Sequence, residues 1–167
     1  MAKRGIERTV RQSLLDRLSD DKPQVGEDPV TGYLESRAHL LASVRRDLES
    51  LLNTRRVPVA SADEFEELSR SVYHYGLTDV AEVSRDSSDA HARLLRQVKD
   101  AIAAFEPRLA NVRVTQAPPP AGGNGHRELR FIIHGLLRMD PDPEQVQFDT
   151  VLELGSGEYE VKGRRDA

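Results

Sequence analysis

The sequence predicts an α+β fold in which N-terminal helices pack on a small C-terminal antiparallel sheet of three or four strands. Two observations support this prediction. Up to Phe105, apolar residues recur every three or four positions, which is typical of amphipathic helices. Beyond Pro107 they alternate with polar residues, which is the period of a half-buried strand. Because proline has no amide hydrogen and ends or kinks a helix, Pro107 marks the boundary.

The first predicted helix covers residues 5–19, where Ile6, Val10, Leu14 and Leu18 recur at intervals of four and Leu15 lies beside them. A loop containing Asp, Gly and Pro separates it from the next helix. This arrangement favours a short helix that docks on a partner. The alternative is a helix that folds back onto its own domain.

Two longer helices are predicted, each with one apolar stripe. The first runs from about residue 35 to residue 53, with the stripe Leu41, Val44, Leu48, Leu51 and Leu52. The second is capped near residues 84–87 and ends at the Pro107 boundary, with the stripe Leu94, Leu95, Val98, Ile102 and Phe105.

A short helix is predicted between these two, because Ser61 and Glu64 fit a capping box. Its buried edge is expected to be Phe65, Leu68 and Val72. Gly76 is the expected left-handed stop that follows.

Four segments beyond Pro107 show the strand period. They centre on residues 112–114, 129–133, 145–148 and 159–161. A Pro- and Gly-rich loop at residues 116–125 separates the first two, and the run Gly155-Ser156-Gly157 is a hairpin turn signal before the last.

The most informative motif is Glu106-Pro107-Arg108, at the change from helix to strand. Pro107 fixes one backbone dihedral and restricts the preceding residue, so two opposite charges are held on a stiff corner. The planar guanidinium of Arg108 suits carboxylates and carbonyl oxygens. We therefore predict that Glu106, Pro107 and Arg108 bind a partner. The alternative is a helix end with a solvated ion pair, since most surface pairs contribute little to stability.

Composition argues against several classes of function. The net charge of −4, with both signs interspersed, argues against bulk electrostatic binding to nucleic acid. The chain contains no cysteine, which removes disulfide and thiolate chemistry. Apolar stretches are shorter than the roughly 20 residues of a membrane span, and a signal-peptide pattern is missing, so we expect no direct membrane insertion.

Candidate chemical sites are sparse. The five histidines lack the i, i+4 spacing of a helical metal pair, so no metal site is expected. The Gly-rich run at residues 122–126 lacks the Lys-Ser/Thr of a phosphate loop, and no cofactor is expected. Glu106 with Asp149 or Glu153 could in principle form the carboxylate pair of a glycosidase, but nothing in the sequence places them opposite one another.

Four sequence blocks in order carry a family resemblance. They are residues 13–18 (SLLDRL), 43–55 (SVRRDLE, then LLNTR), 71–77 (SVYHYGL) and 105–109 (FEPRL). Together they resemble TssE, the baseplate wedge component of bacterial type VI secretion systems, which is similar to the contractile-phage tail protein once called a tail lysozyme. That old name suggests one alternative, a lysozyme-like peptidoglycan glycosidase. Another is the equivalent subunit of a different contractile injection machine.

The resemblance implies a structural subunit, not an enzyme, in a cytoplasmic baseplate docked at the inner face of the bacterial cytoplasmic membrane. Glu106, Pro107 and Arg108 would clamp the helical core bundle of the wedge subunits TssF and TssG, with TssK nearby. The leucine-rich segment would dock on wedge partners through Leu14, Leu15 and Leu18.

A sheet edge would pair with the sheath proteins TssB and TssC and so template assembly of the contractile sheath. The resemblance also implies a wedge domain at residues 33–163. Residues 1–32 would be the docking helix and linker, and residues 164–167 a short tail.

Overall fold

The computed structural model describes residues 16, 18, 24, 33–56, 65–69, 71–78, 88–118, 127–140 and 142–163. Most of the predicted N-terminal helix, including Leu14 and Leu15, lies outside these residues. So do the predicted capping box at 61–64, the predicted helix cap at 84–87, most of the Pro- and Gly-rich loop, and the tail at 164–167.

The described residues place two long helices before the sheet, as the sequence predicts. These are α2 (Tyr33–Asn53) and α4 (Ser88–Phe105), and between them lie the short helix α3 (Glu66–Ser69) and the 3-10 turn η2 (Val72–His74). None of the helices in the described ranges is both long and apolar enough to cross a bilayer.

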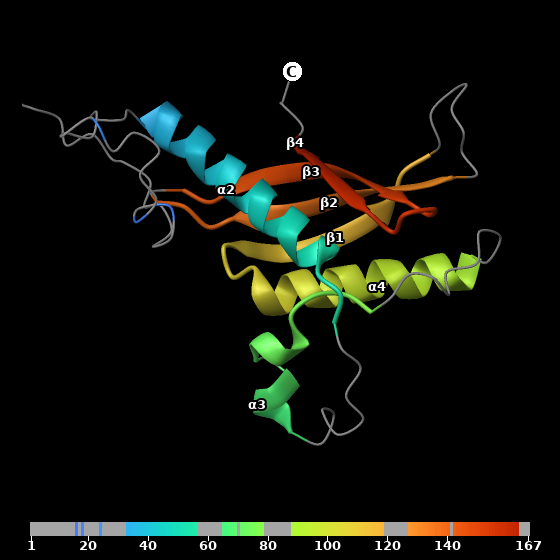
Figure 1. The fold of residues 1–167 in the computed structure, drawn as a ribbon. Helices are drawn as coiled ribbons and strands as arrows, with labels where there is room; N and C mark the ends of the chain where they lie inside the picture. The colour runs from blue at the N-terminus through green and yellow to red at the C-terminus, as the bar shows by residue number, and fades with distance from the viewer. Residues whose placement is uncertain are drawn as a thin grey trace, which may run out of the picture.

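The four strands form one antiparallel sheet in the order β1-β2-β3-β4. They are β1 (Leu109–Gln116), β2 (Glu128–Leu137), β3 (Glu144–Glu153) and β4 (Tyr159–Gly163). Each strand pairs with its neighbour in sequence, so β1 and β4 are the two edges. Figure 1 shows α2 running diagonally across the sheet and α4 beside β1, while α3 and η2 project from the body. The predicted α+β class is confirmed.

The core lies where the apolar stripes of α2 and α4 meet one face of the sheet. On β2, Leu129, Phe131 and Ile133 are buried and the intervening residues are half-buried, as the period of two requires. Each such buried side chain contributes about 1.5–3 kcal/mol through removal of apolar surface from water. This packing holds the end of α4 against the start of β1 and thereby sets the position of the corner between them.

The segment between α2 and α4 differs from the prediction. Phe65 is 59% exposed and Val72 is 88% exposed, so the expectation that they form a buried edge is wrong. The reason is that α3 spans four residues, about one helical turn, and projects away from the sheet (Figure 1). Phe65 and Val72, which flank α3, therefore have no core surface to pack on in the described part of the chain, whereas Leu68 within α3 is half-buried. Leu77 does reach the core, where a parallel bridge joins it to Arg55.

Gly76 has a positive φ of 104°, which confirms the expectation for this glycine. A Cβ atom at this position would lie 2.3 Å from the carbonyl oxygen of Thr54. The Leu77 amide donates to that same carbonyl oxygen at 2.9 Å. Glycine is therefore required where this segment crosses the end of α2.

Candidate partner-binding corner

The corner between α4 and β1 is a compact helix end. The Glu106 amide still donates to the Ile102 carbonyl oxygen (2.9 Å), and the Leu109 amide donates to the Glu106 carbonyl oxygen (3.1 Å). Pro107 has no amide hydrogen to satisfy, which suits its exposed position at the tip. The chain reverses so tightly that the side chains of Glu106 and Arg108 meet.

Glu106 is 4% exposed, which contradicts the alternative interpretation of the motif as a solvated ion pair at a helix end. Arg108 Nε donates to Oε1 of this carboxylate at 2.7 Å, and Arg108 Nη2 donates to Oε2 at 2.5 Å. The Arg108 amide also donates to Oε1 at 3.1 Å. Such bidentate, charge-assisted bonds are among the strongest in proteins, and here they compensate the desolvation of a buried carboxylate.

Arg108 also fastens the corner to α2. Its Nη2 donates to Asp47 Oδ2 at 2.6 Å, and its Nη1 donates to Ser43 Oγ at 3.1 Å. Hydrogen bonding to Glu106 is the largest cause that raises the pKa of Arg108, and Asp47 raises it further. Because four of the five guanidinium N–H groups serve Glu106, Asp47 and Ser43, little of this donor capacity remains for a partner.

The polar network continues from Arg108 through Ser43 to Asp16, in the N-terminal segment. Ser43 Oγ donates to Asp16 Oδ2 at 2.7 Å, and Arg46 Nη2 donates to Asp16 Oδ1 at 2.7 Å. Arg46 Nε also donates to Asp47 Oδ1 at 3.2 Å. At Asp16, therefore, the N-terminal segment contacts its own domain, as the alternative interpretation of that segment requires.

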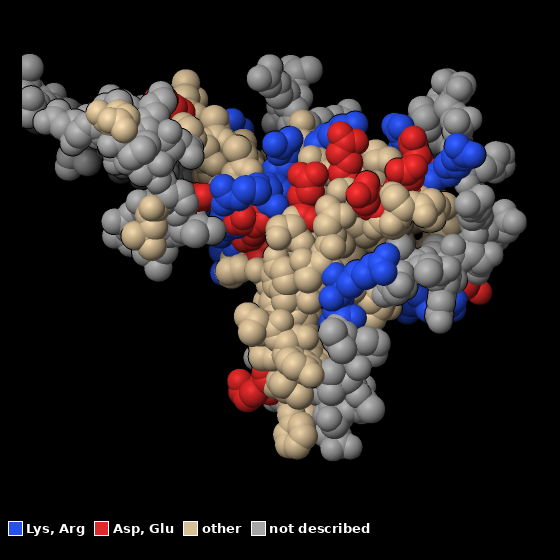
Figure 2. Space-filling view, in the orientation of Figure 1, with Lys and Arg blue, Asp and Glu red and all other residues tan. Residues whose placement is uncertain are grey.

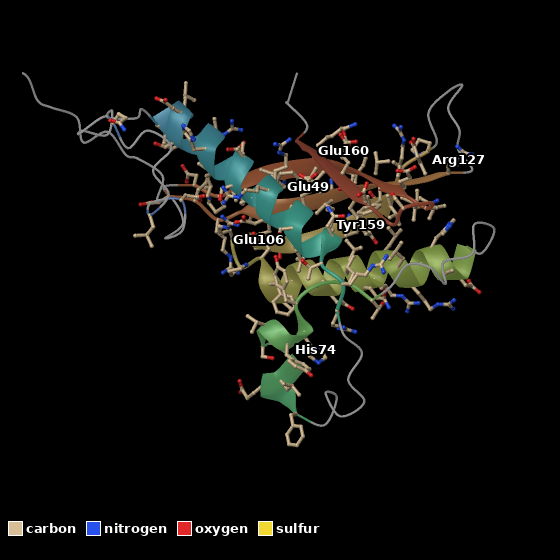
Figure 3. The ribbon with its side chains drawn as sticks, viewed as in Figure 1. Glu49, His74, Glu106, Arg127, Tyr159 and Glu160 are labelled. Atoms are coloured by element: carbon tan, nitrogen blue, oxygen red, sulfur yellow. The ribbon has the colours of Figure 1, made fainter. Side chains whose placement is uncertain are left out.

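A shallow cleft of about 420 Å³ opens beside the corner. Leu51, Tyr75, Phe105 and Pro107 supply its apolar lining, and the partly exposed Asp47 and Arg108 supply its charged rim. The buried Glu106 completes the lining. The rings of Tyr75 and Phe105 meet edge to face with centroids 5.4 Å apart. Figure 3 places Glu106 where the end of α4 approaches α2. An apolar cleft with a charged rim is suited to receive a side chain from a partner helix.

The structure places the predicted site residues in two groups. Glu106, Pro107 and Arg108 meet at the corner. Leu18 is helical and 82% exposed, so its side chain is accessible, whereas Leu14 and Leu15 lie outside the described residues. The predicted docking role of these three leucines stays a prediction.

Sequence reasoning missed the two residues of α2 that hold Arg108. Ser43 and Asp47 are four positions apart, which places them on one helix face, and this spacing was visible in the sequence. Their partner is 65 and 61 positions away, respectively, so only the packing of α2 against the corner reveals their role.

The carboxylates considered for sugar hydrolysis do not form a pair. Glu106 lines the corner cleft and binds Arg108, whereas Glu153 lines a separate groove beside β4. Asp149 lies within β3, opposite Ile132 of β2 and Lys162 of β4. A glycosidase needs two carboxylates that flank one bond. Among the residues that the structure describes, no group of three or more His, Asp or Glu side chains is placed to hold a metal ion.

Comparison with known families bears directly on this corner. A family model described as baseplate wedge protein gp25 matches residues 38–142, which is more than half of the chain. The chain belongs to the baseplate wedge protein gp25 family. The matched region contains most of α2, all of α4, β1 and β2, and the corner itself. No curated protein sequence matches this wedge protein significantly. Family membership supports a structural role in the baseplate of a contractile machine.

Proposed function

We propose that this wedge protein is the TssE subunit of a type VI secretion baseplate and that its corner clamps the core bundle made by TssF and TssG. The observation that carries the proposal is the apolar cleft beside Glu106-Pro107-Arg108. At its rim, Arg108 binds Asp47 and thereby joins the corner to α2. An apolar side chain from a bundle helix would fill the cleft, and the charged rim would orient that helix.

Rigidity is what the buried ion pair contributes. Because most of its donors are engaged within the chain, Arg108 acts as a positioning residue that holds Phe105 and Pro107 against α2. A preformed cleft binds more tightly than one that must be ordered on association. Partner binding therefore depends on Arg108 without requiring that Arg108 itself contact the partner.

Co-purification with TssF and TssG tests the proposal. The wild-type chain should form the complex, whereas Arg108→Ala should lose it while remaining folded by circular dichroism. Arg108→Lys should be intermediate, because an ammonium group cannot reproduce the fork that reaches both Glu106 and Asp47.

Arg130→Ala is the matched control. Arg130 pairs with Glu128 two residues earlier at 2.8 Å, the same spacing as in the corner, but both side chains are 37% exposed on β2. This variant should bind as the wild type does. Absence of any wild-type complex would overturn the assignment to this machine, and normal binding by Arg108→Ala would refute the role of the corner.

The equivalent subunit of another contractile injection machine is the second candidate, and the family match to a baseplate wedge protein favours it as much as it favours TssE. The corner would then act in the same way on different wedge subunits. Failure to bind TssF and TssG, together with capture of that machine's wedge proteins, would support this candidate.

Two further contacts complete the proposed function. The N-terminal leucines dock on wedge subunits, with TssK nearby. The baseplate that contains them lies in the cytoplasm at the inner face of the cytoplasmic membrane.

The second contact is made by one edge of the sheet, which pairs with a strand from the first sheath ring of TssB and TssC. This pairing templates sheath assembly. Strand addition suits a meander whose edges are β1 and β4, because it satisfies unpaired backbone groups on both partners.

A further inference from the structure

We infer that β4, and not β1, is the edge that accepts an added strand, that Asn53 determines where pairing begins, and that the incoming strand carries basic side chains. This inference rests on the strand-addition part of the proposed function. Three features of the described residues support it: a side-chain cap on β4, the irregularity of β1, and the charge beside β4.

Asn53, the last residue of α2, occupies the edge of β4 at Tyr159. The Tyr159 amide donates to Asn53 Oδ1 at 2.9 Å, and Asn53 Nδ2 donates to the Tyr159 carbonyl oxygen at 2.9 Å. A neighbouring strand would satisfy the same two groups in the same way. The side-chain amide therefore takes the place of one residue of the next strand and blocks strand addition at Tyr159.

Pairing positions remain open further along β4. Tyr159 directs its amide and carbonyl away from β3, and this direction recurs at every second residue of an antiparallel strand. Val161 and Gly163 therefore present their backbone groups to the same side. In the described part of the chain, those outward groups have no hydrogen-bond partner. An added strand can thus pair with Val161 and Gly163 but meets Asn53 before it reaches Tyr159.

The β1 edge is a poorer acceptor. Its register with β2 shifts between Ala110 and Arg113, and Asn111 within this bulge has a φ of 53°. Bulges bend an edge strand and interrupt its pairing surface, which is one way in which proteins protect edges. By contrast, β4 keeps a regular register with β3 from Tyr159 to Gly163.

The surface beside the start of β4 is acidic. A groove of about 790 Å³ there is lined by five glutamates and one arginine, among other residues: Glu49, Glu128, Glu153, Glu158, Glu160 and Arg55. Figure 2 shows acidic side chains over β4 and the adjoining part of α2 with basic side chains among them, and Figure 3 places Glu49 on α2 and Glu160 on β4. Glu128 pairs with Arg130 at 2.8 Å and Glu160 pairs with Lys162 at 2.9 Å. The net negative charge of the groove therefore rests mainly on Glu49, Glu153 and Glu158. A strand with Lys or Arg at alternate positions complements this charge, whereas an acidic strand is repelled.

Binding of two labelled ten-residue peptides to the full chain tests the inference by fluorescence anisotropy. One peptide alternates Val with Lys and the other alternates Val with Glu. The Lys peptide should bind at least tenfold more tightly. Gly163→Pro removes one outward amide and should weaken binding at least fivefold. Gly163→Ala keeps the amide, and because an added Cβ meets nothing within 4 Å, it should bind as the wild type does.

Hydrogen exchange on the wild-type chain provides a second measurement that does not depend on the folding of a variant. The Lys peptide should slow exchange of the amides of Val161 and Gly163 and leave that of Tyr159 unchanged. Equal binding of the two peptides, or no binding, would overturn the charge preference. Unchanged exchange at both open positions would overturn the β4 edge. Since co-purification with TssF and TssG reports on the corner, these failures are distinguishable from failure of the clamp.

Discussion

Removal of the Arg108 guanidinium leaves a carboxylate in the protein interior without its counter-ion. Glu106 is 4% exposed and receives two side-chain bonds from Arg108. Breaking a fully buried ion pair destabilises a protein by about 3–5 kcal/mol. Because the Arg108 side chain is 22% exposed, we expect Arg108→Ala to lower the free energy of unfolding by about 2–4 kcal/mol. Domains typically unfold with about 5–15 kcal/mol, so the variant should still fold.

A double-mutant cycle separates the destabilisation caused by the unpaired charge from the destabilisation caused by lost packing. Glu106→Gln removes the charge, so the double variant with Arg108→Ala should be at least about 1 kcal/mol more stable than the sum of the single effects. Urea denaturation followed by circular dichroism at pH 7 measures all four free energies of unfolding. Arg130→Ala, whose ion pair with Glu128 is more exposed, should lower stability by less than about 1 kcal/mol.

Two results would refute this reasoning. One is a loss below about 0.5 kcal/mol for Arg108→Ala, and the other is strict additivity in the cycle. Either would mean that Arg108 does not organise the corner, and any loss of wedge association would then have to come from direct contact with the partner.

Three further predictions concern other parts of the fold. Gly76→Ala should lower the free energy of unfolding by about 1–3 kcal/mol because of its φ of 104° and the approach of Cβ to Thr54, and an unchanged urea midpoint would contradict this. Hydrogen bonding from Arg37 lowers the pKa of Glu144, so this pair stabilises the fold above the unfolded-state pKa of the carboxyl and the stabilisation is lost as pH falls through its folded-state pKa. Glu144→Gln should therefore reduce the acid-side dependence of stability by up to about 1 kcal/mol between pH 7 and pH 3, and identical pH profiles would exclude the pair. The Tyr159 hydroxyl is buried without a hydrogen-bond partner in the described part of the chain, and burial raises its pKa. The stability of the fold is therefore unaffected by this group below the unfolded-state pKa of tyrosine and falls as pH rises above that pKa. Tyr159→Phe should leave the free energy of unfolding at neutral pH unchanged or up to about 1 kcal/mol higher, and the variant should resist alkaline unfolding better. A clear loss of stability at neutral pH would show that the hydroxyl is hydrogen-bonded.

Prediction from the sequence succeeded where burial has a local period. Leu48 and Val98 lie in the predicted helix stripes, and Phe131 and Phe148 lie in the predicted strands; all four are buried. It failed at Val72, because an apolar residue predicts burial only where the fold places another apolar surface over it.

The features of the candidate site also separate into those that the sequence predicts and those that only the tertiary structure reveals. Glu106, Pro107 and Arg108 could be selected from their own chemistry and from the change of period on either side. That Glu106 is buried, and that Ser43 and Asp47 share the guanidinium of Arg108, could not be selected, because these contacts join α2 to a segment more than sixty positions later.

Local chemistry in the chain was thus sufficient to establish the class of fold, the position of the corner and the need for glycine at residue 76. Helix and strand periods, and the missing amide hydrogen of proline, act over a few neighbouring residues, so they can be recognised in the sequence before the fold is known. Tertiary packing decided the partners of Arg108 and the cap that Asn53 places on β4 from 106 positions away. Such contacts form only between elements that the core places side by side. The placement of those elements follows from burying all the apolar stripes together, and no single segment determines it.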